Sequence, residues 1–164
     1  MRDSVTNVVI AGLGGQGVVT ASDILAEAAF RAGHDVKKAE VHGMSQRGGS
    51  VTTDVRFGPK VYSPMVPAGE ADYLVVMEET QADAARDRLR PDGAVLLCGA
   101  IDPAALPTAK ALNVAMMGWL SARLEIPESA WMDALKAALP ERLHEANVRA
   151  FHAGRNTGKE KRHA

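Results

Sequence analysis

The sequence predicts a single α/β domain with three layers (α/β/α, Rossmann-like) around a mixed, mainly parallel sheet with an antiparallel hairpin insertion. Three observations lead to this fold class. A strand pattern at 7–14 runs through a glycine turn into a helix pattern and a second strand pattern, which is the start of a parallel β–α–β unit. Residues 50–58 alternate in the manner of an antiparallel strand. Further strand and helix patterns fill the 164 residues, a length that suits one domain with its own core.

The first unit is identified from its apolar positions and its glycines. "NVVIAGLG" (7–14) is an apolar run that ends in glycines, as expected of a buried strand entering a turn. "HDVKKAEV" (34–41) predicts the second strand, and Gly33 stands where the C-terminal cap of the preceding helix belongs. The apolar face of that helix consists of Val18, Ala21, Ile24, Leu25, Ala28, Ala29 and Ala32.

The next segment departs from the parallel pattern. In "SVTTDVRFG" (50–58), Val51, Thr53, Val55 and Phe57 alternate with Thr52, Asp54 and Arg56, which predicts a strand with one face in water. Gly58-Pro59 predicts a sharp turn, and a strand that resumes at Val61 would complete a hairpin. The sheet should therefore be mixed.

The remaining elements follow from period, turn residues and prolines. They are a buried strand at 72–77, a helix at 78–89, a turn at 90–93, a strand at 94–99, a loop at 100–108, a buried helix at 109–124, a helix from Pro127 to about Leu139, and a last helix from Pro140 to about Ala153. Gly154 should end that helix. We therefore predict one domain over residues 1–154 and a basic, flexible tail over 155–164.

Composition excludes several classes of function. The net charge of −1 gives no field toward nucleic acid or membrane, and no apolar run is long enough to span a bilayer. The N-terminus lacks a signal-peptide core, so we expect a cytoplasmic protein. The one cysteine, Cys98, can neither form an internal disulfide nor supply the four thiolates of an iron–sulfur cluster. It lies in an apolar run, as a core cysteine does.

The first candidate site is the glycine motif "GLGGQG" (12–17), which satisfies G-x-G-x-x-G between a strand and a helix. Its members are Gly12, Gly14, Gly15, Gln16 and Gly17. Such glycines let a phosphate approach the N-terminus of the helix. The alternative is that they only permit tight packing of strand against helix. A complete dinucleotide site would also need an acid at the end of the second strand, where Glu40 is the only fit.

Another class of protein carries a similar glycine motif. Adenylating enzymes of the ubiquitin-activating type have G-x-G-G-x-G, but they commonly add paired cysteines that hold zinc. A chain with one cysteine fits that class poorly.

The second candidate site is "EVHGMSQRGGSV" (40–51), which is unsuited to a helix or a buried strand. Its glycines leave the backbone without side chains, so another group can approach it closely. Ser45, Gln46 and Arg47 offer donors, and an arginine can hold a carboxylate or phosphate at two points. His42 could exchange protons near neutral pH. The alternative is a solvated turn whose polar residues satisfy its own backbone.

The sequence also lacks the motifs of a self-sufficient redox enzyme. There is no C-x-x-C, no P-loop lysine motif, no G-x-S-x-G, and no G-D-G followed by paired asparagines, which is the usual diphosphate–magnesium motif of thiamine enzymes. The chain has a candidate phosphate cradle and a donor-rich loop, and we assign no catalytic residue and no metal site to it.

Three ordered stretches resemble one known family. They are "NVVIAGLGGQGVVTASDILAEAAFRAGHDV", "EVHGMSQRGGSVTTDVRFG" and "VYSPMVPAGEADYLVVME", and the match resumes at "ALNVAMMGWLSARLEIP" and "ALPERLHEANVRAFHAGR". They are similar to the gamma-type domain of 2-oxoacid:acceptor oxidoreductases, above all to the beta subunit of indolepyruvate ferredoxin oxidoreductase. Such domains usually have a longer segment where this chain has only residues 100–110, so the role of that segment is open here.

The resemblance implies a subunit of a cytoplasmic hetero-oligomer of anaerobic metabolism that is inactive alone. The complex oxidatively decarboxylates a 2-oxoacid, usually to an acyl-CoA, and passes electrons to ferredoxin or another acceptor. Thiamine diphosphate, magnesium and iron–sulfur clusters belong to partner subunits in this resemblance, and this chain holds no cofactor alone but could contact CoA. An aryl 2-oxoacid such as indolepyruvate or phenylglyoxylate is the implied substrate.

By the same resemblance, the loop at 40–51 faces the active site of a partner, beside the glycine turn. The residues expected to make contacts are His42, Met44, Ser45, Gln46 and Arg47. Two other functions stay open: a stand-alone nucleotide- or CoA-binding module, and a purely structural assembly subunit whose glycine turn is empty.

Overall fold

The structure is a computed structural model, and it describes residues 4–42 and 49–162. Five strands form one sheet in the order β2-β3-β1-β4-β5. Their bounds are β1 (Thr6–Leu13), β2 (Asp35–His42), β3 (Ser50–Gly58), β4 (Ala71–Val76) and β5 (Leu89–Leu97). β1, β4 and β5 are mutually parallel, and β3 is antiparallel to both β1 and β2. The predicted mixed sheet is confirmed.

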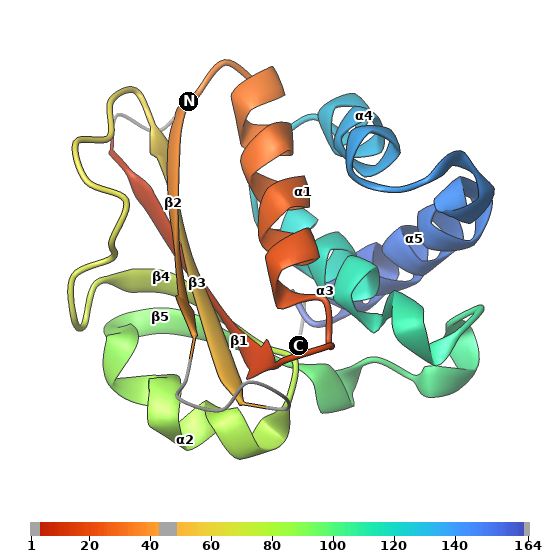
Figure 1. Cartoon of the computed structure of the whole chain (residues 1–164), viewed down its shortest axis with the longest axis horizontal. Coiled ribbons are helices and arrows are strands. Elements are labelled where there is room, and N and C mark those ends of the chain that lie inside the picture. The colour runs from red at the N-terminus through yellow and green to blue at the C-terminus, as the bar shows by residue number, and fades with distance from the viewer. Residues whose placement is uncertain (1–3, 43–48, 163–164) are drawn as a thin grey trace.

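The two faces of the sheet are covered very differently (Figure 1). The helices are α1 (Val18–Arg31), α2 (Ala82–Ala85), α3 (Leu112–Ser121), α4 (Glu128–Ala138) and α5 (His144–Glu160). The larger core joins one face to α1, α3, α4 and α5, with Trp131 and Phe151 fully buried in it. A smaller core on the other face includes Val66 and Ala85, from the 59–70 segment and α2. The three predicted layers are present, and the second helical layer is thin.

The hairpin has a different second strand from the one that the sequence predicted. β3 pairs with β2, from Asp35 opposite Gly58 to His42 opposite Val51. The strand expected to resume at Val61 does not form. Residues 59–70 instead cross the face of the sheet that carries the smaller core. We call this segment the strap. Three prolines in the strap cannot donate to a strand ladder, which explains why it adds no strand.

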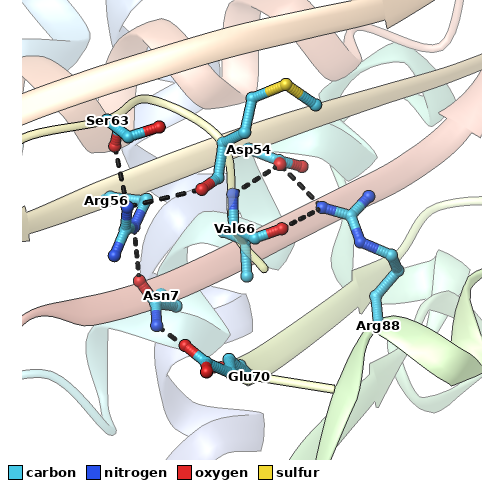
Figure 2. A network of polar contacts seen from close by, with 8 residues as sticks. Asn7, Asp54, Arg56, Ser63, Val66, Glu70 and Arg88 are labelled. Atoms are coloured by element: carbon cyan, nitrogen blue, oxygen red, sulfur yellow. Dashed lines mark hydrogen bonds and ion pairs between the residues drawn. The ribbon is translucent and has the colours of Figure 1, made fainter. Parts of the chain in front are cut away.

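The sequence predicted that one face of β3 would lie in water. The strap instead packs on that face and forms hydrogen bonds with its polar side chains (Figure 2). Asp54 is fully buried, and its Oδ2 accepts hydrogen bonds from Val66 N at 2.8 Å and from Arg88 Nη2 at 2.7 Å. Arg56 donates to the carbonyl oxygens of Ser63 and Met65 at 2.8 and 3.3 Å. Asp54 and Arg56 therefore bind the backbone of the strap.

The segment 78–93 also differs from its prediction. The expected helix is broken into the 3₁₀ turns Glu79–Gln81 and Arg86–Arg88 around the short α2. The expected turn at 90–93 is part of β5, whose register with β4 is irregular between Ala71 and Tyr73. Gly93 permits this close approach, because a Cβ there would lie 2.8 Å from the carbonyl oxygen of Ala71.

The last helix continues well beyond its predicted end. α5 runs to Glu160, so residues 155–160, expected to be a flexible tail, are helical. Gly154 lies inside the helix because α3 and α5 touch through their backbones. A Cβ on Gly154 would overlap the carbonyl oxygen of Ala115, and a Cβ on Gly118 would overlap that of Phe151. Close packing, and not a helix end, explains this glycine.

The predicted buried helix is confirmed, since almost every residue of α3 is buried. No helix within residues 4–42 and 49–162 combines the length and the apolar character needed to cross a bilayer.

Candidate functional site

The parallel strands end at one edge of the sheet, where the chain leaves in opposite directions. β1 leads into α1, which packs on the face with the larger core, whereas β4 leads toward α2 on the other face. β1 and β4 are neighbours. The chain therefore diverges between them, and in α/β sheets ligands bind in the crevice outside the carboxyl ends at such a switch point.

The glycine turn lies on this crevice and is held by the side chain of Gln16. Its Oε1 accepts a hydrogen bond from Leu13 N at 2.7 Å, and its Nε2 donates to Glu78 Oε2 at 3.0 Å. Gly14 N donates to Gly49 O at 2.9 Å, which ties the turn to the start of β3. Gln16 thus joins the ends of β1 and β4.

The structure separates the two explanations of the glycines residue by residue. A Cβ on Gly12 would lie 2.7 Å from Val18 Cγ2, and one on Gly17 would overlap the amide of Asn113. Those two glycines serve close packing. Gly15 has a φ of +88°, and a Cβ there would have no neighbour within 4 Å among the residues that the structure describes. Gly15 is therefore required by its left-handed backbone, and its surface is open to an approaching group.

The N-terminus of α1 provides partial positive charge beside Gly15. Gly17 caps the helix without a side-chain hydrogen bond, and the first turn holds no acidic residue. A hollow of about 500 Å³ next to the turn is lined by Gly15, Gly17, Met77 and Lys110, among others. Uncapped backbone N–H groups and a lysine together suit an anion such as a phosphate.

A second hollow, of about 380 Å³, lies on the other side of the turn. It brings His42 together with Gly14, Gly15 and the first turn of α1. His42 ends β2 with about 60% of its side chain exposed, and its Nε2 is 3.6 Å from Glu40 Oε2. The hydrogen bond from Lys38 lowers the pKa of Glu40, and His42 adds to this effect. The structure thus places His42 beside the glycine turn, and its predicted contact with a partner stays a prediction.

The other predicted contact residues, Met44, Ser45, Gln46 and Arg47, lie outside the residues that the structure describes. Their assignment stays a prediction.

The topology disfavours a self-sufficient dinucleotide site. β3 lies between β1 and β2, so Glu40 is not on the strand next to the glycine turn. The ribose-binding acid of a dinucleotide fold stands on that neighbouring strand.

Cys98 lies at the same edge of the sheet, after β5, and is half-buried against the larger core. Burial raises the pKa of its thiol, and the carboxylates of Glu79 and Glu78 raise it further. A thiol in this state is a weak nucleophile, which agrees with the predicted core role.

Sequence reasoning missed three residues at this edge: Glu78, Lys110 and Asn113. Asn113 Nδ2 donates to Gly17 O at 3.3 Å across 96 residues of sequence, and Gln16 meets Glu78 across 62. No local pattern marks such residues. The signal available was the position of Glu78, directly after a predicted parallel strand.

The glycines of the turn should differ in their tolerance to alanine. Gly15→Ala is expected to lower the free energy of unfolding by roughly 1–2 kcal/mol, the cost of a left-handed non-glycine residue. Gly17→Ala should lower it further, because its Cβ also overlaps Asn113. Urea denaturation measures both. Equal losses would contradict the packing role of Gly17.

The family model and the related proteins that match this chain agree on one family. Residues 7–110 match the family model described as pyruvate ferredoxin/flavodoxin oxidoreductase. The indolepyruvate oxidoreductase subunit IorB of Thermococcus kodakarensis is 55% identical over 76 residues, which cover 46% of this chain and 38% of that protein. The pyruvate/ketoisovalerate oxidoreductases common subunit gamma of Pyrococcus furiosus is 41% identical over 73 residues, 44% of this chain and 40% of that protein. The matched segment thus spans less than half the length of these relatives.

A solved structure supports the fold over nearly the whole chain. The gamma subunit of a keto/oxoacid ferredoxin oxidoreductase from Geobacter sulfurreducens superposes with a TM-score of 0.80 at 20% identity, covering 96% of this chain and 98% of that one.

Proposed function

The chain belongs to the pyruvate ferredoxin/flavodoxin oxidoreductase family, and from this premise we propose that it is a non-redox, gamma-type subunit of a thiamine diphosphate-dependent 2-oxoacid:acceptor oxidoreductase. The complex would oxidatively decarboxylate a 2-oxoacid to an acyl-CoA. An aryl substrate such as indolepyruvate is supported by the 55% identity with the indolepyruvate oxidoreductase subunit. We place this function in the cytoplasm.

The proposal assigns the cofactors to partner subunits. One cysteine cannot ligate a four-thiolate cluster. Thiamine diphosphate, magnesium, the iron–sulfur clusters and the contact with ferredoxin or another acceptor would thus reside in other chains.

The observation that carries the role of this chain is the switch-point crevice with an open glycine. Gly15, the N-terminus of α1 and Lys110 line a hollow that suits an anionic group. We propose that this edge faces the partner's active site and contacts a phosphate of CoA or the carboxylate of the 2-oxoacid. The loop from His42 to Arg47 would complete the same surface.

A structural assembly subunit is the second candidate function. It is favoured by Gln16, whose amide is already engaged by Leu13 N and Glu78, and by the packing roles of Gly12 and Gly17. In that case the crevice would hold no ligand.

Purification alone and with the thiamine-bearing partner tests the proposal. The isolated chain should be colourless and inactive in 2-oxoacid-dependent reduction of a viologen dye, and the complex should be active. A brown, active isolated chain would contradict the proposal.

A matched pair of glycine variants separates the two candidates. Gly15 and Gly69 both have positive φ and open surroundings, so alanine at either position has the same conformational cost. In the purified complex, Gly15→Ala should raise the Michaelis constant for CoA or the 2-oxoacid, and Gly69→Ala should not. Equal kinetics in the two variants would favour the structural role.

The loop at 42–47 gives a further expected result. Arg47→Ala should reduce kcat/KM for the 2-oxoacid or CoA by roughly tenfold or more, because a charge-assisted hydrogen bond contributes on the order of 1.5–3 kcal/mol. His42→Ala should have a smaller effect if the imidazole orients the loop, whereas loss of a proton-transfer group costs on the order of a hundredfold. Arg142→Ala, at an exposed position before α5, is the control. Normal association and wild-type turnover in both loop variants would show that the loop is only a solvated turn.

A further inference from the structure

A cavity smaller than the two hollows beside the glycine turn lies at the opposite edge of the sheet. Its volume is about 130 Å³. It is lined by the start of β1, the end of β3, His34 after α1, and the residues that follow α3. The cavity and the switch point lie at opposite ends of the strands. The proposed function therefore does not use this cavity.

The titratable side chains that line this cavity are mostly basic. They come from three parts of the chain: His34, Arg123 after α3, and Arg162 after α5. Glu125 is the one carboxylate among the described lining residues, and the side chains of Ser4 and Thr6 add hydroxyl groups. Among the described lining residues, the two guanidinium groups therefore exceed the single carboxylate even when His34 is neutral.

Two buried nitrogen atoms of these side chains lack hydrogen bonds. His34 Nδ1 and Arg123 Nε have no partner among the residues that the structure describes. A buried donor without an acceptor costs about 1–3 kcal/mol, more when it is charged. An ion or an ordered water that completes the site is one established explanation for such groups.

Neighbouring residues hold several parts of this cavity in place. The ring of His34 packs against the edge of Phe57 with centroids 5.3 Å apart. Arg162 Nη1 donates to the carbonyl oxygen of Ala122 at 3.3 Å, and the carbonyl oxygen of Arg123 accepts from the hydroxyl of Tyr73 at 3.4 Å. The His34 ring and the Arg162 guanidinium group are thus held by protein contacts, whereas at Arg123 the contact holds the backbone.

We propose that this cavity binds a tetrahedral oxyanion, a phosphate or sulfate group. Cationic groups and hydroxyls that converge from β1, α3 and the end of α5 suit a ligand with four acceptor oxygens better than a planar carboxylate. The small volume fits one such group. The oxyanion would accept hydrogen bonds from the buried donors and balance the charge of the two arginines.

Burial also lowers the pKa of His34. A bound oxyanion would raise this pKa, since it favours the protonated ring; the other charged groups that line the cavity are Arg123, Arg162 and Glu125. Binding of an anion whose own charge is constant should therefore strengthen as the pH falls through the titration of His34.

Sulfate is the probe for the test, because its charge does not change near neutral pH. The full-length chain, purified without phosphate or sulfate, would be titrated by calorimetry with sulfate, inorganic phosphate and acetate at constant ionic strength. Sulfate and phosphate should bind and acetate should not. Proton NMR of the histidine rings should show the His34 titration midpoint move upward with sulfate.

Three variants complete the test. Arg123→Gln and Arg162→Gln should each weaken sulfate binding roughly tenfold, the loss of one charge-assisted hydrogen bond. Arg149→Gln removes an equal charge from an exposed position on α5 and should bind as the unaltered chain does. Because Arg162 is exposed, its variant should fold even if the Arg123 variant does not. Absence of sulfate binding, binding of acetate as tight as that of sulfate, or equal weakening by Arg149→Gln would overturn the proposal.

Discussion

Gly154→Ala is expected to lower the free energy of unfolding by about 3 kcal/mol, the upper part of the usual range for an overpacked core. In an exposed helix the same change would stabilise the protein by about 1 kcal/mol, because alanine is the better helix former. Here the sign reverses, since the added Cβ would overlap the carbonyl oxygen of Ala115 and force α5 away from α3. Urea denaturation followed by far-UV circular dichroism measures the change.

Asn156→Ala provides the control on the same helix. Asn156 is exposed, so its substitution should leave the protein equally or slightly more stable. If Gly154→Ala proves neutral or stabilising, the backbone contact between α3 and α5 is not as close as the structure has it.

Arg88→Met is the second substitution with a large expected effect. It leaves the carboxylate of Asp54 buried without its cation, and removal of one partner of a buried pair costs about 3–5 kcal/mol. About 1% of the Asp54 side chain and 22% of the Arg88 side chain are exposed, so solvent screens this pair little. The strap should become susceptible to proteolysis between Lys60 and Val66, because Arg88 also donates to Val66 O at 3.0 Å.

A double variant tests the electrostatic explanation directly. Asp54→Asn combined with Arg88→Met removes both charges, while the asparagine oxygen can still accept from Val66 N. The double variant should therefore be more stable than Arg88→Met alone. Arg90→Met serves as the control, since Arg90 pairs with Asp72 and Asp92 at the surface, where ion pairs contribute little. A double variant less stable than the single one would contradict the explanation.

The candidate site was predictable only where its residues are close in sequence. The glycine turn and His42 could be found because a strand, a turn and a helix follow one another directly. Lys110 and Asn113 could not, because they come from the start of α3 and the turn before it, and Asn113 lies 96 residues from Gly17 in sequence. The sequence also could not separate Gly15 from Gly17, since their different roles depend on the position of Asn113.

The sequence by itself determined the elements whose evidence is local. Apolar period, glycine caps and prolines were enough for β1, α1, β4, α3 and α4, and for the mixed α/β class. The tertiary structure decided three things: that β3 pairs with β2, that the strap covers the other face of β3, and that α5 continues through Gly154. Each depends on a contact between segments distant in sequence. The sequence around Asp54 is the same whether its carboxylate lies in water or pairs with Arg88. Likewise, the sequence around Gly154 is the same whether a helix ends there or packs against Ala115.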